Sequence, residues 1–127
     1  MLKRLHHAAI ICADYQRSKY FYSEILGLEI VAENYRAARD SYKLDLALPD
    51  GAQIELFSFP DAPPRPSYPE AQGLRHLAFA VEDVREVKTI LESQGIEVEP
   101  IRIDEYTGRM FTFFQDPDGL PLEVYQA

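Results

Sequence analysis

The sequence predicts an α+β fold made of two tandem modules, each with the element order β-α-β-β-β. Three observations predict it: an internal repeat, a helical pattern of apolar residues near the start of each half, and strand-like segments around each predicted helix. The chain has 127 residues, of which 46 % are hydrophobic and 27 % are charged. This length and composition are typical of a folded domain rather than of a disordered chain.

The internal repeat is defined by five residues that recur at nearly constant distances along the chain. The matched pairs are His7/His76, Asp14/Asp83, Gly27/Gly95, Gly51/Gly119 and Glu55/Glu123. The first two pairs are 69 residues apart and the other three are 68 residues apart. The second half therefore lacks one residue between its aspartate and its first glycine, where a helix is predicted. We interpret the pattern as a duplication.

A helix is predicted near the start of each half. Asp14 and Asp83 precede these helices, and a short carboxylate in that place accepts bonds from the free N–H groups of a helix N-terminus. Gly27 and Gly95 follow where a left-handed C-cap residue is expected. The apolar positions at helical spacing are Phe21, Tyr22, Ile25 and Leu26 in the first half and Val84, Val87, Ile90 and Leu91 in the second.

Strands are predicted on both sides of each helix. The apolar run over residues 5–13 suits a buried strand that Asp14 ends. The Asp-Gly pairs at 50–51 and 118–119 indicate hairpin turns. The other strands are expected at 28–36, 42–48 and 52–59 in the first half and at 96–104, 109–115 and 120–126 in the second.

Within a single domain of 127 residues, the two modules are predicted to span about 1–59 and 74–127. Residues 60–73 between them contain five prolines, which favour an extended and stiff connector. We interpret the connector as a spacer. The alternative is a flap over a pocket, with Arg65 and Tyr68 facing a ligand.

The charge and the apolar runs argue against several classes of protein. The formal net charge is −8, which disfavours binding to nucleic acid or to an anionic membrane. No apolar run approaches the ~20 residues that span a bilayer, and the run over residues 8–13 is too short for a signal peptide. Cys12, the single cysteine, lies in that run and is expected to be buried and reduced. A cytoplasmic location is therefore expected.

The candidate metal ligands are the histidine and the glutamate that recur in each half, namely His7, Glu55, His76 and Glu123. Imidazole nitrogen and carboxylate oxygen bind zinc, nickel and similar ions. Each glutamate stands between two apolar residues of a predicted strand, so its side chain points to the opposite face from theirs. Two related modules are expected to bring the four side chains to one divalent-metal site.

His6 competes with His7 for the first ligand position. The repeat selects His7, because Arg75 and not a histidine precedes His76. His6 is expected to face the other side of the strand and to be structural.

These motifs resemble the vicinal oxygen chelate superfamily of glyoxalases, bleomycin-resistance proteins and dioxygenases, and within it glyoxalase I and related bacterial proteins. The resemblance covers nearly the whole chain. It rests on the four candidate ligands together with Asp14, Phe21-Tyr22, Leu26-Gly27, Gly73-Leu74-Arg75, Asp83 and Asp116-Pro117-Asp118-Gly119. It implies that the paired modules form a half-open barrel around one metal ion. It also implies a homodimer, sometimes with modules exchanged between chains.

The resemblance also implies a chemistry. In this superfamily the dioxygenases and the fosfomycin-modifying enzymes lack a ligand at the position of Glu55, whereas bacterial glyoxalase I uses all four. A lactoylglutathione lyase-like enzyme is therefore expected, which moves a proton next to the metal-chelated carbonyl of a 2-oxoaldehyde thiol adduct or a related small molecule. Glu123 is the expected base and Glu55 the alternative. Nickel or zinc is favoured as the ion, and cobalt, manganese and iron also suit the ligands.

Two positions depart from glyoxalase I, which generally has an arginine and an asparagine that help to hold glutathione. Here these positions are Ile11 and Phe59, and neither side chain can pair with glutathione. Basic side chains from residues 35–40, or Arg65 or Arg109, are candidates for a pocket lip. The alternatives to a lyase are a non-catalytic protein that sequesters a metal or a drug, and an iron dioxygenase, against which Glu55 argues.

Overall fold

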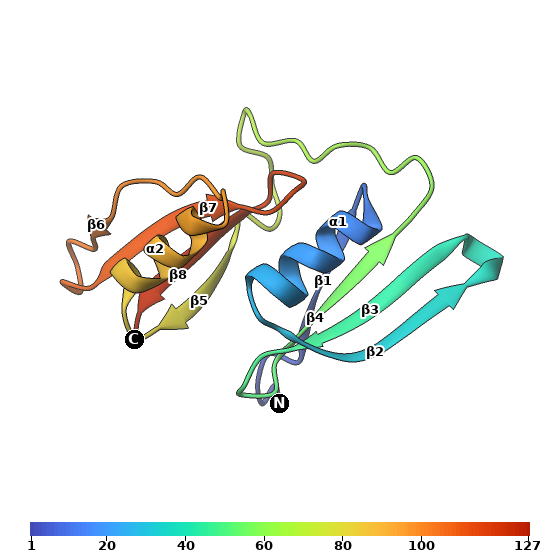
Figure 1. Cartoon of the computed structure of the whole chain (residues 1–127), viewed down its shortest axis with the longest axis horizontal. Helices are drawn as coiled ribbons and strands as arrows, with labels where there is room; N and C mark the ends of the chain where they lie inside the picture. The colour runs from blue at the N-terminus through green and yellow to red at the C-terminus, as the bar shows by residue number, and fades with distance from the viewer. The chain divides into compact units, whose positions relative to one another are not determined.

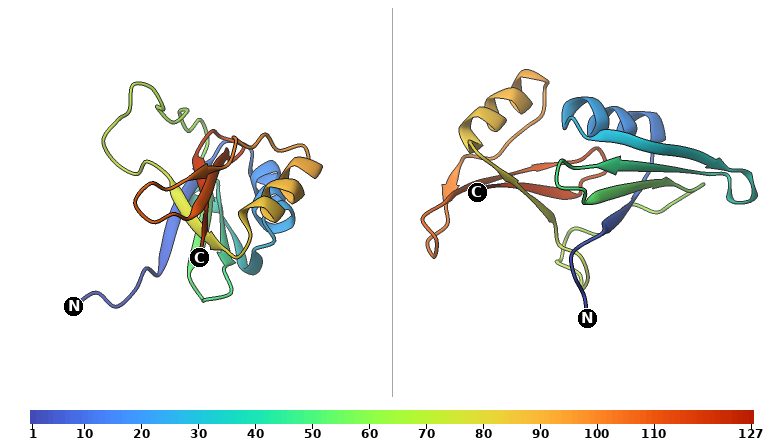
Figure 2. Two further views of the ribbon diagram at one scale, coloured as in Figure 1. Left: turned by 90° about the vertical axis from the view of Figure 1, so that its left-hand side faces the viewer. Right: turned by 90° about the horizontal axis from the view of Figure 1, so that it is seen from below.

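The computed structural model describes all 127 residues, and the chain divides into two compact units, Met1–Pro64 and Arg65–Ala127 (Figure 1). Each unit has a four-stranded sheet, and a helix lies on one face of it (Figure 2). The predicted β-α-β-β-β order is confirmed in both halves. The division falls inside the proline-rich connector that the sequence predicts.

Unit 1 forms a mixed sheet with the strand order β1-β4-β3-β2. Strand β1 pairs with β4 in parallel, and the other neighbours are antiparallel. A short 3₁₀ turn, η2, joins β2 to β3. The elements are β1 (His7–Cys12), α1 (Tyr15–Tyr20), η1 (Phe21–Ile25), β2 (Glu29–Arg36), η2 (Ala37–Arg39), β3 (Ser41–Ala47) and β4 (Gln53–Ser58).

The first helix begins at Asp14, as predicted, and ends in a π-turn. The Asp14 carboxylate accepts a hydrogen bond from the backbone N–H of Arg17 at 3.2 Å. At the other end, the N–H of Leu26 donates to the carbonyl of Phe21 at 2.9 Å, across five residues. Such a bond encloses one residue more than an α-helical turn. The extra residue of the first half is accommodated here, before Gly27 adopts a φ of 73°.

Alternation along the strands gives the sheet of unit 1 a buried face and an open face. The buried face lies toward α1, and its residues Ile10, Cys12, Leu44, Leu46, Ile54 and Leu56 are at most 7 % exposed. The expected burial of Cys12 is confirmed. We call the opposite side the open face of unit 1. It carries His7, Lys43, Asp45, Glu55 and Phe57, which are half-buried or exposed.

Unit 2 repeats this plan with the strand order β5-β8-β7-β6. Asp83 caps α2 as predicted, because its carboxylate accepts the backbone N–H groups of Arg85 and Glu86 at 2.9 and 3.2 Å. Gly95 follows α2 with a φ of 81°. The elements are β5 (Leu77–Val81), α2 (Val84–Ser93), β6 (Arg102–Ile103), β7 (Met110–Gln115) and β8 (Pro121–Gln126).

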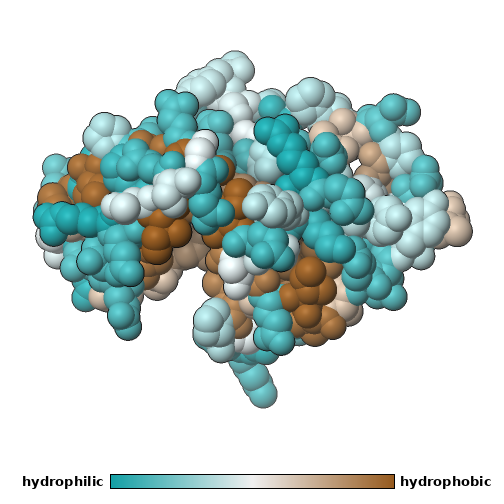
Figure 3. All heavy atoms as spheres, viewed as in Figure 1, coloured by the Kyte–Doolittle hydropathy of each residue, from teal (hydrophilic) through white to brown (hydrophobic).

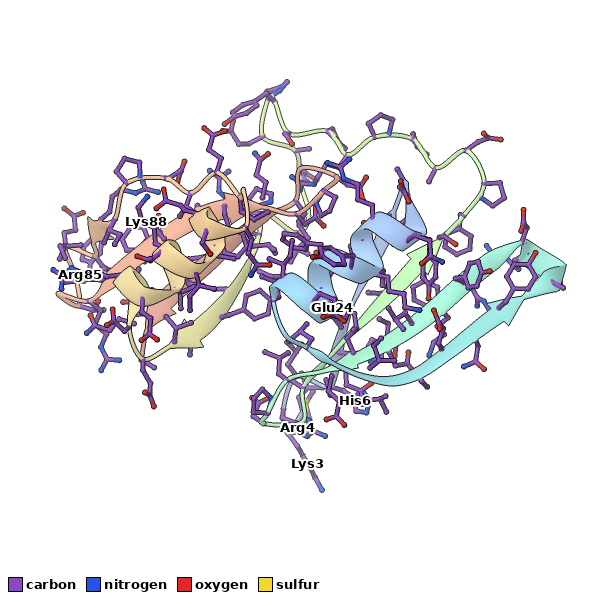
Figure 4. All side chains as sticks on the ribbon, viewed as in Figure 1. Lys3, Arg4, His6, Glu24, Arg85 and Lys88 are labelled. Carbon is purple, nitrogen blue, oxygen red and sulfur yellow. The ribbon has the colours of Figure 1, made fainter.

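The strand predicted over 96–104 is wrong in its extent, since β6 covers only Arg102–Ile103. Pro100 has no N–H with which to continue a ladder of hydrogen bonds. Before it, Val98 keeps a single bridge to β7. Lys88, which Figure 4 labels on α2, donates to the carbonyl oxygen of Val98 at 3.1 Å. A side chain of the helix therefore bonds to a backbone carbonyl group that would have paired with another strand if the predicted strand had formed.

The connector bonds mainly to itself. Arg65 donates to Ser67 Oγ at 3.3 Å and to the carbonyl oxygen of Leu74 at 3.4 Å, while Tyr68 is 86 % exposed. On the face drawn in Figure 3, hydrophilic residues cover much of the surface and hydrophobic ones form separate patches. No helix of the structure is long and apolar enough to cross a membrane.

Candidate metal centre

The two glutamates of the repeat take equivalent positions in the two sheets. Glu55 lies on β4 and Glu123 on β8, each in the central part of the strand that pairs with the first strand of its unit. Their strand neighbours point the other way and are buried against the helix, namely Ile54, Leu56, Leu122 and Val124. The alternation predicted from the sequence is confirmed, and it turns both carboxylates to the open faces.

In unit 1, His7 and Glu55 form a pair on the open face. Nδ1 of His7 lies 3.5 Å from Oε2 of Glu55, and the side chains are 41 % and 15 % exposed. His7 begins β1, and the parallel register places Ala9 beside Glu55. The small side chain of Ala9 leaves room for the imidazole ring to reach the carboxylate.

In unit 2, His76 and Glu123 form the matching pair. Nε2 of His76 lies 3.7 Å from Oε1 of Glu123, and the side chains are 30 % and 14 % exposed. The imidazole ring meets the ring of Phe113 edge to face, with centroids 5.0 Å apart. Ala78 is the register partner of Glu123, as Ala9 is of Glu55. The repeat therefore extends from sequence to the placement of both pairs, while a different imidazole nitrogen faces the carboxylate in each.

The expected orientation of His6 is corrected. Its Nδ1 lies 2.9 Å from Nδ1 of His7, and the two rings meet edge to face. Since β1 begins at His7, strand alternation does not govern the residue before it. Figure 4 labels His6 at this start of the strand. His6 is therefore a neighbour of the candidate ligand rather than a residue of the opposite face.

Two charged residues of this face were missed by the sequence analysis. Lys43 lies with its Nζ 2.7 Å from Oδ1 of Asp45 and 3.8 Å from Oε1 of Glu55. The antiparallel register of β3 and β4 pairs Asp45 with Glu55 directly. The signal in the sequence is their alternation with the buried Leu44 and Leu46, which places both on the face of Glu55.

Glu123 also lines a pocket within unit 2. The pocket has a volume of about 410 Å³, and its lining residues are Ile103, Asp104, Glu105, Tyr106, Phe111, Glu123 and Tyr125. This volume is within the range of small-molecule sites. The backbone N–H of Tyr106 and the hydroxyl of Tyr125 donate to the Asp104 carboxylate at 2.9 Å each, and they hold its pKa below the ordinary value. Asp104 is thus ionised at neutral pH and fixes the ring of Tyr125.

The donor atoms of both pairs suit a divalent ion. Two ligand atoms that each lie about 2.1 Å from one ion are about 3.0 to 3.4 Å apart, depending on the coordination geometry. The separations of 3.5 and 3.7 Å in the two pairs need only small side-chain adjustments to match. No group of three or more histidine, cysteine, aspartate or glutamate side chains is gathered in the structure. Each unit therefore offers two candidate ligands.

Similarity to known proteins assigns the family of the chain. Residues 4–124 match the model of the Glyoxalase/Bleomycin resistance protein/Dioxygenase superfamily. The chain belongs to this superfamily, as the sequence motifs predict.

Two bacterial proteins resemble the chain over nearly its whole length. YaeR of Escherichia coli K12, an uncharacterised protein, is 58 % identical over 98 % of this chain and 97 % of its own. YwkD of Bacillus subtilis 168, also uncharacterised, is 56 % identical over 99 % of this chain and 98 % of its own. The crystal structure of a glyoxalase family protein from Enterococcus faecalis is 53 % identical, covers 97 % of each chain and has a TM-score of 0.90.

Proposed function

We propose that the protein is a divalent-metal-dependent lyase or isomerase of the glyoxalase I type. It would move a proton next to the carbonyl of a 2-oxoaldehyde thiol adduct or a related small α-hydroxycarbonyl compound. The observation that carries the proposal is the His–Glu pair that recurs on the open face of each unit, with separations of 3.5 and 3.7 Å. Membership of the superfamily supports it.

The proposed ligands are His7, Glu55, His76 and Glu123, which together would hold one ion, with nickel or zinc favoured. When bound, such an ion polarises a substrate carbonyl and makes the adjacent C–H bond more acidic. Imidazole and carboxylate leave the ion with Lewis acidity, and four protein ligands leave positions open for substrate oxygens. We further propose that the protein acts as a homodimer and that its partner in binding is a small molecule.

Glu123 is the residue that we propose as the base. Its carboxylate is 14 % exposed and lines the 410 Å³ pocket, so a small substrate can reach it. It would take the proton from the carbon that bears the hydroxyl and return it to the former carbonyl carbon. The hydroxyl proton would pass to the former carbonyl oxygen, so that the isomerisation balances. Phe111 and Tyr125 of the pocket wall would offer apolar surface to the carbon skeleton of the substrate. Glu55 is the alternative base.

A second candidate function is non-catalytic sequestration of a small molecule. It is favoured by one observation, the aromatic lining of the same pocket by Tyr106, Phe111 and Tyr125, since such rings bind flat ligands without any reaction. Metal binding without turnover on thiol adducts would favour this candidate over the lyase.

The test combines elemental analysis with an assay on the adduct of methylglyoxal and a thiol. We expect Glu123→Gln to lower kcat by at least about 100-fold, because general-base catalysis typically contributes that much. Glu105→Gln is the matched control, since Glu105 lines the same pocket outside the His–Glu pair and loses the same charge. If Glu55→Ala and His76→Ala both keep their full metal content, the site assignment is wrong.

A further inference from the structure

Two guanidinium groups gather on aromatic rings at one end of the open face of unit 1. Arg36 ends β2, and Arg39 lies in η2 directly after it. Cζ of Arg36 lies 5.0 Å from the ring centre of Phe57 and 5.8 Å from that of Phe59. Cζ of Arg39 lies 4.8 Å from the ring centre of Phe59. Both positive charges therefore share one aromatic platform.

No protein carboxylate neutralises these two charges. The ion pairs of unit 1 join His7, Lys19 and Lys43 to carboxylates, and neither arginine takes part in them. Arg36 donates one hydrogen bond, from Nη2 to Ser41 Oγ at 3.1 Å, and its Nε is buried without a partner. A guanidinium has five N–H donors, so most of those on Arg36 have no protein acceptor. The chain has 21 acidic and 13 basic residues. Two guanidinium groups on one ring without a carboxylate partner are therefore an unusual local positive charge.

The turn that presents Arg39 has fixed geometry. Asp40 adopts a φ of 45°, its N–H donates to the carbonyl oxygen of Ala37 at 3.2 Å, and its carboxylate accepts the hydroxyl of Tyr35 at 2.6 Å. Strand alternation places Tyr35 on the other side of β2 from Arg36. The nearest acidic residue in sequence is thus engaged away from the two guanidiniums.

Other basic side chains near the predicted pocket lip are already occupied. Arg102 also lies over aromatic rings, 5.0 Å from the centre of Phe111, but its Nη2 is 3.3 Å from the carboxylate of Glu99. Arg109 donates to the carbonyl oxygen of Gln126 at 3.4 Å. In unit 2, the guanidinium that lies on aromatic rings is therefore neutralised by a carboxylate. The two guanidiniums on aromatic rings in unit 1 are not.

The position of the arginines relates them to the candidate ligands. Phe57 follows Glu55 by two residues on β4, and so lies on the same face about 6.8 Å further along the strand. A small molecule that contacts Glu55 with one end can therefore reach the guanidiniums with the other. Phe59 stands where glyoxalase I generally has an asparagine. Both guanidinium groups lie over the ring of Phe59.

We propose that Arg36 and Arg39 form an anion subsite that binds a carboxylate or phosphate group of the substrate. This proposal rests on the proposed function, and it narrows the substrate to a small α-hydroxycarbonyl or 2-oxo compound with an anionic group. Guanidinium donors suit both anions, because paired N–H groups match two oxygen atoms of either. The aromatic rings hold the guanidiniums in place and leave their edges for the anion.

The test measures anion binding without metal or turnover. The ¹⁵N-labelled full-length protein, stripped of metal with a chelator, is titrated with inorganic phosphate or acetate at constant ionic strength. The readout is the set of Nε–H resonances of the arginines. We expect saturable shifts at Arg36 and Arg39, and an affinity about tenfold weaker in Arg36→Met and in Arg39→Met. Tighter binding of phosphate than of acetate identifies a phosphate-bearing substrate, and the reverse identifies a carboxylate.

Arg102→Met is the matched control, since it removes a guanidinium that lies on an aromatic ring but is paired with Glu99. It should leave both titrations unchanged. Shifts that sodium chloride reproduces, or that Arg102→Met weakens equally, would overturn the subsite. Because the titration uses no metal and no turnover, this result is distinct from a failure of the proposed lyase activity, which metal content and the adduct assay detect.

Discussion

Lys43 places a positive charge beside one of the proposed metal ligands. Its Nζ lies 3.8 Å from Glu55 and 2.7 Å from Asp45. A divalent ion held by Glu55 would be repelled by this ammonium group. A divalent ion and an ammonium group about 6 Å apart in a water-like medium repel each other by on the order of 1 kcal/mol. This repulsion lowers the affinity for the ion by close to a factor of ten.

We therefore expect Lys43→Met to tighten the binding of a divalent ion by up to about tenfold at low salt, and by less as salt is added. The measurement is a competition between the protein and a chromophoric chelator. Lys19→Met is the control, because Lys19 pairs with Glu33 at 2.8 Å rather than with a candidate ligand. Weaker binding in Lys43→Met would instead mean that Lys43 holds Glu55 in its ligating position.

The residues of the site differ in how far the sequence could predict them. The four candidate ligands were found because the duplication preserved them in both halves. Lys43 and Asp45 were missed because the same offset of 68 residues pairs them with Phe111 and Phe113, so the repeat gives no signal there. Only the register of β3 on β4 places them beside Glu55. The orientation of His6 was wrong because it lies before the strand whose alternation was applied to it.

At the scale of the element, the π-turn is where the two halves differ in length. The bond from Leu26 to Phe21 encloses one more residue than an α-helical turn and belongs to the π-helical segment Phe21–Ile25. The second helix contains no such segment, and its bond of the same span, from Ile96 to Leu91, lies beyond its last turn. Removing one exposed residue from this turn should restore an ordinary α-turn without rotating the residues after it. The buried Phe21 and Tyr22, which precede the deleted position, keep their places.

We expect deletion of Glu24, which is exposed, to lower the free energy of unfolding by no more than about 1 kcal/mol. Deletion of the exposed Thr89 from α2 is the control. It would turn the residues after it by about 100° around the helix axis and move the buried Leu91 off the sheet, at a cost of about 3 kcal/mol or more. Urea unfolding measures both, and equal losses would show that the π-turn is required by its surroundings.

The elements show which sequence signals were sufficient. Both helices begin at the predicted aspartates and both hairpins turn at the predicted Asp-Gly pairs, because these signals act over two to four residues. The strand predicted over 96–104 was too long, because the prediction followed the apolar residues of this segment and gave too little weight to Pro100. Part of its backbone bonds to a lysine on α2, and a pattern of apolar residues gives no information on such a contact.

At the scale of the whole molecule, the two halves share the candidate ligands and differ in the residues around them. The open face of unit 1 is charged, with Lys43 and Asp45 beside Glu55, whereas the equivalent places in unit 2 are the rings of Phe111 and Phe113. An enzyme that polarises one end of a small molecule and shields the other from water needs both kinds of surface. The two units are thus expected to contribute equal numbers of ligands and different substrate contacts.

If each unit contributes one His–Glu pair, removal of either pair should have the same effect on the binding of the ion. A histidine and a carboxylate alone bind a divalent ion weakly, so one pair should not retain the ion when the other is removed. We expect the double variants His7→Ala/Glu55→Ala and His76→Ala/Glu123→Ala to lose the ion to the same extent, as measured by elemental analysis after dialysis. Full retention in either variant would mean that one unit binds the ion by itself.

Co-expression of the two variants then shows which chains supply the ligands. An ion regained in the mixture requires one unit from each of two chains. No gain places all four ligands in one chain.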